Sequence, residues 1–363
     1  MLHRFWFGAV HLTCAASIAA GCAPERPMAA TPPTDASFAR PSTTPAYTAT
    51  DIGALFDGRS QANGVNDAGE VVGELSSAAG FQAFAIIAAV PTLLPGDGRA
   101  SGISNSTPRY IVGFSGAPSR PVLWTVTGGT PSGPTLLAVL ADETSGEALG
   151  VNDAGAAVGR AGPRAAMWSV TGVRTSVPPP GGLGFVRGEG RDINNAGHAV
   201  FVFFDGTSEL AAARGYVRLA SGQLVELPPL PGDVTTFANN LSEVVNNVVY
   251  VAGTTQAGQS VFRGVRWTVD VTTGAILGTE VRSENAHALD VSNAGATVGF
   301  LDAARSLKTS AFLWRGSELL SLKPPKGGNN AHAWAMSPSG AFVVGDAVFG
   351  TTRHAVLWTI LAP

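Results

Sequence analysis

The stretch that decides the fold is Val65-Asn66-Asp67-Ala68-Gly69-Glu70-Val71-Val72-Gly73. Two apolar runs flank a short Asn-Asp-Ala-Gly segment. Asn and Asp bond their own backbone in tight turns, and Gly accepts a positive φ at no steric cost. The stretch therefore predicts two β-strands joined by a tight turn. The same pattern recurs at 151–159 and 291–299, and with Ser-Pro-Ser-Gly in place of the turn at 336–345.

Three degenerate copies bring the number of units to seven. They lie at Ile103-Ser104-Asn105, Ile193-Asn194-Asn195-Ala196-Gly197 and Leu241-Ser242. A second apolar element follows each copy, and in five units it ends in Trp: Trp124, Trp168, Trp267, Trp314 and Trp358. A third, shorter apolar run then precedes a Pro or Gly turn. Each unit thus predicts four strands and no helix.

A four-stranded sheet that is apolar on both faces must pack against copies of itself. We predict an all-β fold over residues 47–363, a seven-bladed β-propeller of four-stranded antiparallel blades. The seventh unit lacks a fourth strand after Trp358, and residues 47–55 resemble a fourth strand without a sheet. The N-terminal strand is therefore expected to close the last blade. An open β-solenoid is the alternative architecture.

Composition limits the possible functions. Hydrophobic residues make up 45% of the 363 residues and charged residues 13%, which excludes a charged disordered chain. With a net charge of −3 the chain has no long-range attraction for a polyanion, so no nucleic-acid partner is expected.

The N-terminus has the pattern of an export signal over residues 1–21, since His3 and Arg4 precede an apolar stretch from Phe5 to Ala20. Ile18-Ala19-Ala20-Gly21-Cys22 resembles the bacterial lipobox, which implies a lipid on Cys22 and attachment to a membrane through it. An uncleaved anchor and an ordinary signal peptidase site are the alternatives. Residues 22–46 are rich in Pro, Ala, Ser and Thr and predict a flexible tether. We expect an exported protein, lipid-anchored in the bacterial outer membrane or at the cell surface, or else secreted or periplasmic.

The repeated motifs are similar to those of the extracellular HAF-repeat family. The resemblance is carried by the Val-Asn-Asp-Ala-Gly units, by Asp51-Ile52-Gly53-Ala54-Leu55 and by His354-Ala355-Val356-Leu357-Trp358, and it extends over residues 51–358. It implies an exported repeat protein and brings no assigned reaction.

Alignment of the units exposes two polar columns. The first lies just before the small anchor residue of the first strand, such as Ala62, and differs from unit to unit: Gln61, Arg99, Glu147, Glu189, Phe237, His287 and His332. If the first strand is innermost, these side chains ring the central channel and form a ligand-binding rim, or they are ordinary solvated residues.

The second column opens the third strand of each unit and contains four arginines: Arg120, Arg164, Arg214 and Arg263. Guanidinium groups in equivalent places bind a carboxylate or sulfate polymer through their planar fork. The alternative is that they cap backbone carbonyls or pair with an Asp of the neighbouring blade.

The common enzyme motifs are missing from the sequence, so no catalytic residue and no cofactor is assigned. Calcium binding by Asp67, Asp97, Asp153 and Asp233 lacks the dense carboxylate spacing of a calcium loop, and no metal is expected. We predict a monomeric, non-catalytic binding or scaffold module for a protein or glycan of the cell envelope. The alternative is a propeller hydrolase or lyase acting on a polysaccharide, with Glu147 or Glu189 as acid or base and His287 or His332 assisting.

Overall fold

The computed structural model describes residues 46–361 apart from 182–183, 207–212, 259–260 and 303–307. The predicted export signal, Cys22 and the tether as far as residue 45 lie outside the described residues. β-Strands dominate this part of the chain, together with a short 3-10 helix, η1 (Gly53–Leu55). No helix within it is long and apolar enough to cross a membrane.

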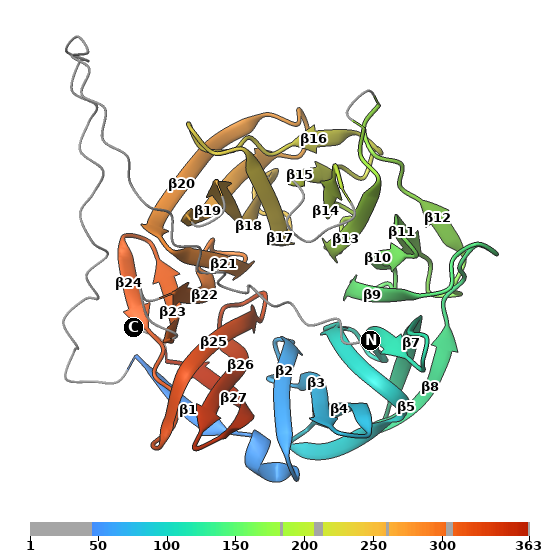
Figure 1. Cartoon of the computed structure of the whole chain (residues 1–363), viewed down its shortest axis with the longest axis vertical. Helices are drawn as coiled ribbons and strands as arrows, with labels where there is room; N and C mark the ends of the chain where they lie inside the picture. Colours follow the sequence, from blue (N-terminus) through green and yellow to red (C-terminus); the bar gives the residue numbers. More distant parts are fainter. Residues whose placement is uncertain (1–45, 182–183, 207–212, 259–260, 303–307, 362–363) are drawn as a thin grey trace, which may run out of the picture. The chain divides into compact units, whose positions relative to one another are not determined.

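The strands form antiparallel sheets arranged around a common centre (Figure 1). The largest sheet contains β2 (Arg59–Val65), β3 (Val71–Ser77), β4 (Gly80–Ile87), β5 (Val90–Ile103), β6 (Arg109–Ser115), β7 (Arg120–Thr127) and β8 (Thr130–Leu136). Within it, β5 pairs with β4 as far as Asp97 and with β6 from Gly98 onward. This sheet is therefore two groups of four strands that share one long strand.

The next sheets have four strands each, in chain order from the centre outward. The first contains β9 (Gly146–Val151), β10 (Ala157–Ala161), β11 (Arg164–Trp168) and β12 (Arg174–Ser176). The second contains β13 (Arg187–Ile193), β14 (Ala199–Phe204), β15 (Ala213–Arg218) and β16 (Leu224–Glu226). The third contains β17 (Thr235–Leu241), β18 (Val248–Ala257), β19 (Val261–Asp270) and β20 (Ile276–Glu284). The fourth contains β21 (Ala286–Val291), β22 (Thr297–Asp302), β23 (Thr309–Arg315) and β24 (Glu318–Ser321).

The last sheet combines strands from opposite ends of the described chain. It contains β25 (Gly328–Met336), β26 (Phe342–Phe349), β27 (Thr352–Ile360) and β1 (Tyr47–Asp51), in the order β25-β26-β27-β1. The antiparallel register of β1 on β27 runs from Tyr47 opposite Ile360 to Asp51 opposite Val356. The prediction that the segment before the first unit supplies the missing strand is confirmed for residues 47–51, while residues 53–55 form η1.

The Asn-Asp-Ala-Gly segments form the turns that the sequence predicts. The side-chain Oδ1 of Asn66 accepts hydrogen bonds from the backbone N–H of Ala68 (3.1 Å) and of Glu70 (3.0 Å). Gly69 has a φ of +73°, a conformation that strains any residue with a Cβ. Asn152 and Gly155 repeat these roles in the turn between β9 and β10. The turn therefore requires Asn for its side-chain hydrogen bonds and Gly for its positive φ.

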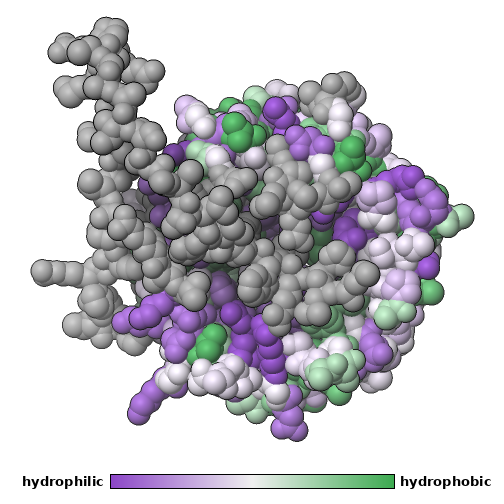
Figure 2. Space-filling model, in the orientation of Figure 1, coloured by the Kyte–Doolittle hydropathy of each residue, from purple (hydrophilic) through white to green (hydrophobic). Residues whose placement is uncertain are grey.

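Apolar side chains fill the space between neighbouring sheets. The five repeated tryptophans are at most 2% exposed, and four of them donate their Nε1–H to a backbone carbonyl in the segment that precedes their own unit. These pairs are Trp124 with Pro95, Trp168 with Ala138, Trp267 with Pro228 and Trp358 with Lys323. The Trp column thus packs the core and ties each unit to the segment before it. On the face seen in Figure 2, hydrophobic residues reach the surface in several small patches separated by hydrophilic ones.

Candidate functional site

The first strand of each unit lies nearest the centre: β2, β5, β9, β13, β17, β21 and β25 (Figure 1). The C-terminal ends of these strands and the turns after them surround a cavity of about 130 Å³. Its charged lining residues are Arg191 and four acids, namely Asp153, Asp192, Glu243 and Asp290. The cavity is therefore predominantly acidic.

Every innermost strand contains a β-bulge next to this cavity. In β2 the register shifts between Ala62 and Gly64, and the other six strands shift at the equivalent place. The residue after the bulge is small in four units. It is Gly at 150, where an added Cβ would lie 2.6 Å from the Cα of Asp192. The bulges thus bring neighbouring backbones close together around the centre.

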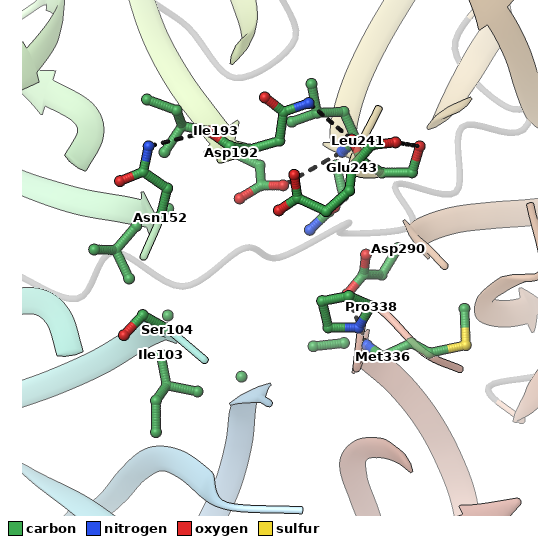
Figure 3. Close-up of a pocket in the computed structure, with 18 of the residues that line it drawn as sticks. Ile103, Ser104, Asn152, Asp192, Ile193, Leu241, Glu243, Asp290, Met336 and Pro338 are labelled. Carbon is green, nitrogen blue, oxygen red and sulfur yellow. Dashed lines mark hydrogen bonds between the residues drawn. The ribbon is translucent and has the colours of Figure 1, made fainter. Parts of the chain in front are cut away.

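Three units carry a polar residue at this position after the bulge: Asp192, Asn240 and Asp290. Figure 3 shows Asp192, Glu243 and Asp290 on one side of the cavity, across from Ile103 and Ser104. The Oδ2 of Asp290 accepts the backbone N–H of Met336 in the next sheet (2.7 Å), and the Oδ2 of Asp192 accepts that of Leu241 (3.4 Å). Both carboxylates therefore join adjacent sheets.

Burial dominates the ionisation of these two acids. Desolvation raises the pKa of Asp192 to about 7, against the effect of hydrogen bonds from backbone N–H groups. Desolvation also raises the pKa of Asp290 well above its ordinary value, and the negative charge of Asp192 adds to that shift. At neutral pH the pair is therefore partly protonated, which makes it a weaker attractor of cations than two ionised carboxylates.

The second residue of each turn forms a ring of hydrogen bonds around the cavity. In each step, the backbone N–H of one turn donates to an oxygen of the turn in the next unit. The donors and acceptors are Asp67 to Asn105, Asn105 to Asp153, Asp153 to Asn195, Asn195 to Glu243, Glu243 to Asn293 and Asn293 to the carbonyl of Pro338. Ser339 then donates its N–H to Oδ1 of Asp67 (2.8 Å) and completes the circle. Asp67 and Asp153, considered above as calcium ligands, serve in this ring.

The first polar column lies on the innermost strands as predicted, but none of its seven members is among the residues that line the cavity. Glu147, Glu189 and His287 are at most 7% exposed, so they are not solvated positions. Arg99 forms an ion pair with Glu147 in the next sheet, and Arg191 with Glu189. Gln61 donates to the side chain of Asn63 (2.9 Å). The Arg99–Glu147 pair joins two sheets, whereas the contacts of Glu189 and Gln61 stay within their own strands. The ligand-binding role of the column stays a prediction.

The remaining members of the column are aromatic or pack on aromatic rings. Phe237 lies 6.3 Å from Phe204, measured between ring centroids. His287 stacks on Phe300 at 4.6 Å, and Phe300 in turn meets His332 edge-on at 4.6 Å. His332 also contacts the buried carboxylate of Asp346 (2.8 Å). Among the described residues no group of three or more His, Cys, Asp or Glu is arranged to hold a metal ion.

Three members of the arginine column form ion pairs with acids within the described part of the chain, and Arg120 does not. Arg164 pairs with Asp142 (2.8 Å) and Glu143 (3.1 Å), Arg214 with Glu226, and Arg263 with the buried Asp233. Arg120 forms neither a hydrogen bond nor an ion pair through its side chain within the described part of the chain, and its Nε is buried without a partner. The column therefore does not act as one surface.

Sequence reasoning missed Asp192 and Asp290. A signal for both is visible in the repeat, because the residue before the β-branched anchor is Gly at 64, 102 and 150. Asp192 and Asp290 replace this Gly in their own units. A carboxylate at a position that is Gly in three other units is the signal that could have identified them.

Comparisons with known proteins address the fold. No family model matches the sequence, and no curated protein does. A chain of the mitotic checkpoint complex is 10% identical, with a TM-score of 0.50 over 90% of this chain and 97% of that one. TolB from Acinetobacter baumannii is 10% identical with a TM-score of 0.43 over 80% of this chain, which spans 63% of the TolB chain. The β-propeller domain of the Trilobed protease from Pyrococcus furiosus is 10% identical, with a TM-score of 0.40 over 71% of this chain and 82% of that one. Identities this low concern the fold alone. The radial, antiparallel, four-stranded sheets are those of a β-propeller.

Proposed function

We propose that this chain is a non-catalytic binding module built on a propeller of seven blades. The seven-stranded sheet counts as two blades that share β5, and the last blade takes β1 as its fourth strand. The pairing of β1 with β27 supports circular closure, as does the bond from Ser339 to Asp67 between the last turn and the first. The chain therefore presents a closed ring of loops to a partner.

The observation that carries the non-catalytic assignment is the pairing of the rim acids. Oε1 of Glu147 accepts hydrogen bonds from Arg99 and from the Oγ of Ser101 (3.2 Å), and Arg191 forms an ion pair with Oε1 of Glu189. A general acid or base must present a carboxylate oxygen to its substrate. Guanidinium groups occupy that position on both acids here. Arg99 joins Glu147 to the preceding blade, and Arg191 holds Glu189 within their common strand β13.

We further propose that the module is exported and anchored by a lipid on Cys22 in the bacterial outer membrane or at the cell surface, where a protein or glycan of the envelope is its partner. The signal pattern of residues 1–21 and the lipobox-like segment before Cys22 support this assignment. Loops between the second and third strands, such as residues 116–119, differ in length between units and are the proposed contact surface. Metabolic labelling with an alkyne fatty acid tests the anchor. Label is expected on the wild type and lost in Cys22→Ser, and an unlabelled wild type excludes the lipid.

The binding assignment is tested with a glycan and peptidoglycan array, together with cross-linking to envelope proteins. Retention of one class of partner without its turnover is the expected result. In parallel, polysaccharide turnover is measured for the wild type and for Glu147→Gln and Glu189→Gln, with circular dichroism as a check on folding. Measurable turnover by the wild type that a folded Gln variant loses would identify a polysaccharide-degrading enzyme instead.

A further inference from the structure

A groove of about 670 Å³ lies between the end of β8 and the start of β12, away from the central cavity. Its lining consists of Arg120, residues 136–140 and residues 171–174, and it shares no lining residue with the cavity. Both β8 and β12 are the outermost strands of their sheets (Figure 1). The groove therefore belongs to the outer edge of two neighbouring sheets.

The groove is held in shape by hydrogen bonds from both sides. Ala138 donates its N–H to the carbonyl of Gly172 (3.1 Å) and accepts the Nε1–H of Trp168 on its own carbonyl (2.7 Å). Leu140 donates its N–H to Oε2 of Glu143 (2.8 Å), while the N–H of Glu143 donates to the carbonyl of Leu140 (3.0 Å). The groove is thus preformed, and binding of a ligand costs little conformational entropy in the protein.

Aliphatic side chains form the exposed part of the groove. Leu136 is 61% exposed, Leu140 is 45% exposed and Val173 is 65% exposed. Aliphatic side chains that are scattered singly over a surface need no explanation, whereas several in one groove favour an apolar ligand. The groove can therefore pack against an aliphatic group of a ligand.

The charges around the groove do not balance. Arg174 is paired with Glu143 (2.8 Å), and Arg164 is paired with Asp142 and Glu143. These two arginines and two acids compensate one another, and Arg120 adds a positive charge with no side-chain partner within the described residues. A partly buried guanidinium without a counter-charge favours an anion that supplies the missing hydrogen-bond acceptors.

We propose that this groove binds an extended peptide segment of a partner protein, in which a carboxylate side chain pairs with Arg120 and an adjacent aliphatic side chain packs on Leu136, Leu140 and Val173. A free fatty acid is disfavoured because its acyl chain would stay in contact with water in an open groove, whereas small-molecule sites enclose most of their ligand. A peptide also gains backbone hydrogen bonds from a sheet edge, and β12 pairs within its sheet with β11 alone. The proposal concerns a surface other than the central cavity and does not depend on the function assigned above.

The test uses an array of capped pentapeptides that contain Asp next to Leu or Val, with matched copies that carry Asn instead. Binding to the purified full chain is measured by fluorescence polarisation. At least one Asp peptide is expected to bind, and its Asn copy at least tenfold more weakly. Arg120→Gln should lower the affinity for the Asp peptide at least tenfold. Arg315→Gln, at a half-buried arginine of another sheet that pairs with Glu318, should leave the affinity for the Asp peptide unchanged.

Leu136→Asp provides a second variant at an exposed position, where the fold tolerates a polar side chain. It places a negative charge in the groove and is expected to weaken the Asp peptide at least tenfold as well. Equal binding of Asp and Asn peptides, or full binding by Arg120→Gln or Leu136→Asp, would overturn the proposal. So would the absence of binding across the array, or octanoate displacing the peptide at equal molar concentration.

Discussion

The inner turns and the outer groove of this propeller differ in whether their charged side chains have partners. In the ring of turns, Asp67, Asp153 and Glu243 each accept a backbone N–H of an adjacent turn, so their hydrogen-bonding capacity serves the contact between sheets. At the groove, Arg120 has no such partner among the described residues and Leu136 stands in solvent. The hydrogen bonds of the inner ring repeat from unit to unit, whereas the arginines at the position of Arg120 pair differently in each unit.

The comparison teaches how to divide a repeat protein into structural and interacting parts. A residue that recurs at the same place in each unit has the same neighbours each time, and those neighbours satisfy it. A residue that departs from the repeat has no such guarantee. Substitutions that break a contact between the inner parts of two sheets should therefore lower stability, whereas substitutions at the groove should alter binding alone.

Deletion of residues 47–51 should produce the largest effect, because it removes β1 and leaves the edge of β27 unpaired. Tyr47 also packs on the apolar cluster between the last two sheets. We expect loss of the cooperative unfolding transition or aggregation, measured by circular dichroism and size-exclusion chromatography. A deletion variant that unfolds at the wild-type temperature would contradict circular closure. It would also show that the contacts between the first and last units do not stabilise the fold.

Trp267→Ala should lower the free energy of unfolding by about 3–5 kcal/mol, because it leaves a cavity between two sheets. Trp267 is fully buried and donates to the carbonyl of Pro228 (3.1 Å). Trp267→Phe is the matched control: it keeps an aromatic ring, loses the N–H donor and should cost less. Urea unfolding measures both. An alanine variant as stable as the phenylalanine variant would mean that the column does not pack the core.

The repeat predicted the inner part of the fold well. The turn motif gave the hairpins and the roles of Asn66 and Gly69, and the Trp column gave the core between sheets. These features follow from local backbone preferences and from side-chain size, and both can be inferred from the sequence.

The cavity was not predictable by the same means. Each innermost strand contains a bulge, and the extra residue, such as Asn63 or Arg191, changes which side chains face the centre. The column that includes Glu147 and His287 was expected around the channel, and none of its seven members lines the central cavity. The groove depends on how the segment after β8 meets the turn before β12, which no repeated pattern encodes.

Asp192→Asn sharpens the comparison within the inner strands, since Asp192 breaks the repeat where most units have a small residue. Its pKa of about 7 in the folded chain exceeds the ordinary value of about 3.9 in the unfolded chain. Between these values the folded state holds a proton that the unfolded state has released, so stability falls as pH rises from about 4 to about 7. Asn has no such penalty. For this partly buried side chain we expect the variant to be more stable than the wild type by about 2 kcal/mol at pH 8, with little difference at pH 4. Urea unfolding across this range checks the prediction, and parallel pH profiles would contradict it.

Arg120→Gln should have the smallest effect on stability and gives the sharpest contrast between the two regions. The substitution removes a partly buried charge that has no side-chain partner in the described structure, so no ion pair is broken and the cost of holding the charge away from water disappears. The free energy of unfolding should change by less than about 0.5 kcal/mol or rise slightly. Glu147→Gln is the matched inner substitution, because it removes the nearer of the two counter-charges of Arg99 and leaves Glu74 at 3.9 Å. It should lower the free energy of unfolding by about 3 kcal/mol. Thermal unfolding of the two variants side by side measures the difference. A loss of stability in Arg120→Gln as large as that in Glu147→Gln would show that Arg120 belongs to the framework and that the groove is not a surface kept free for a partner.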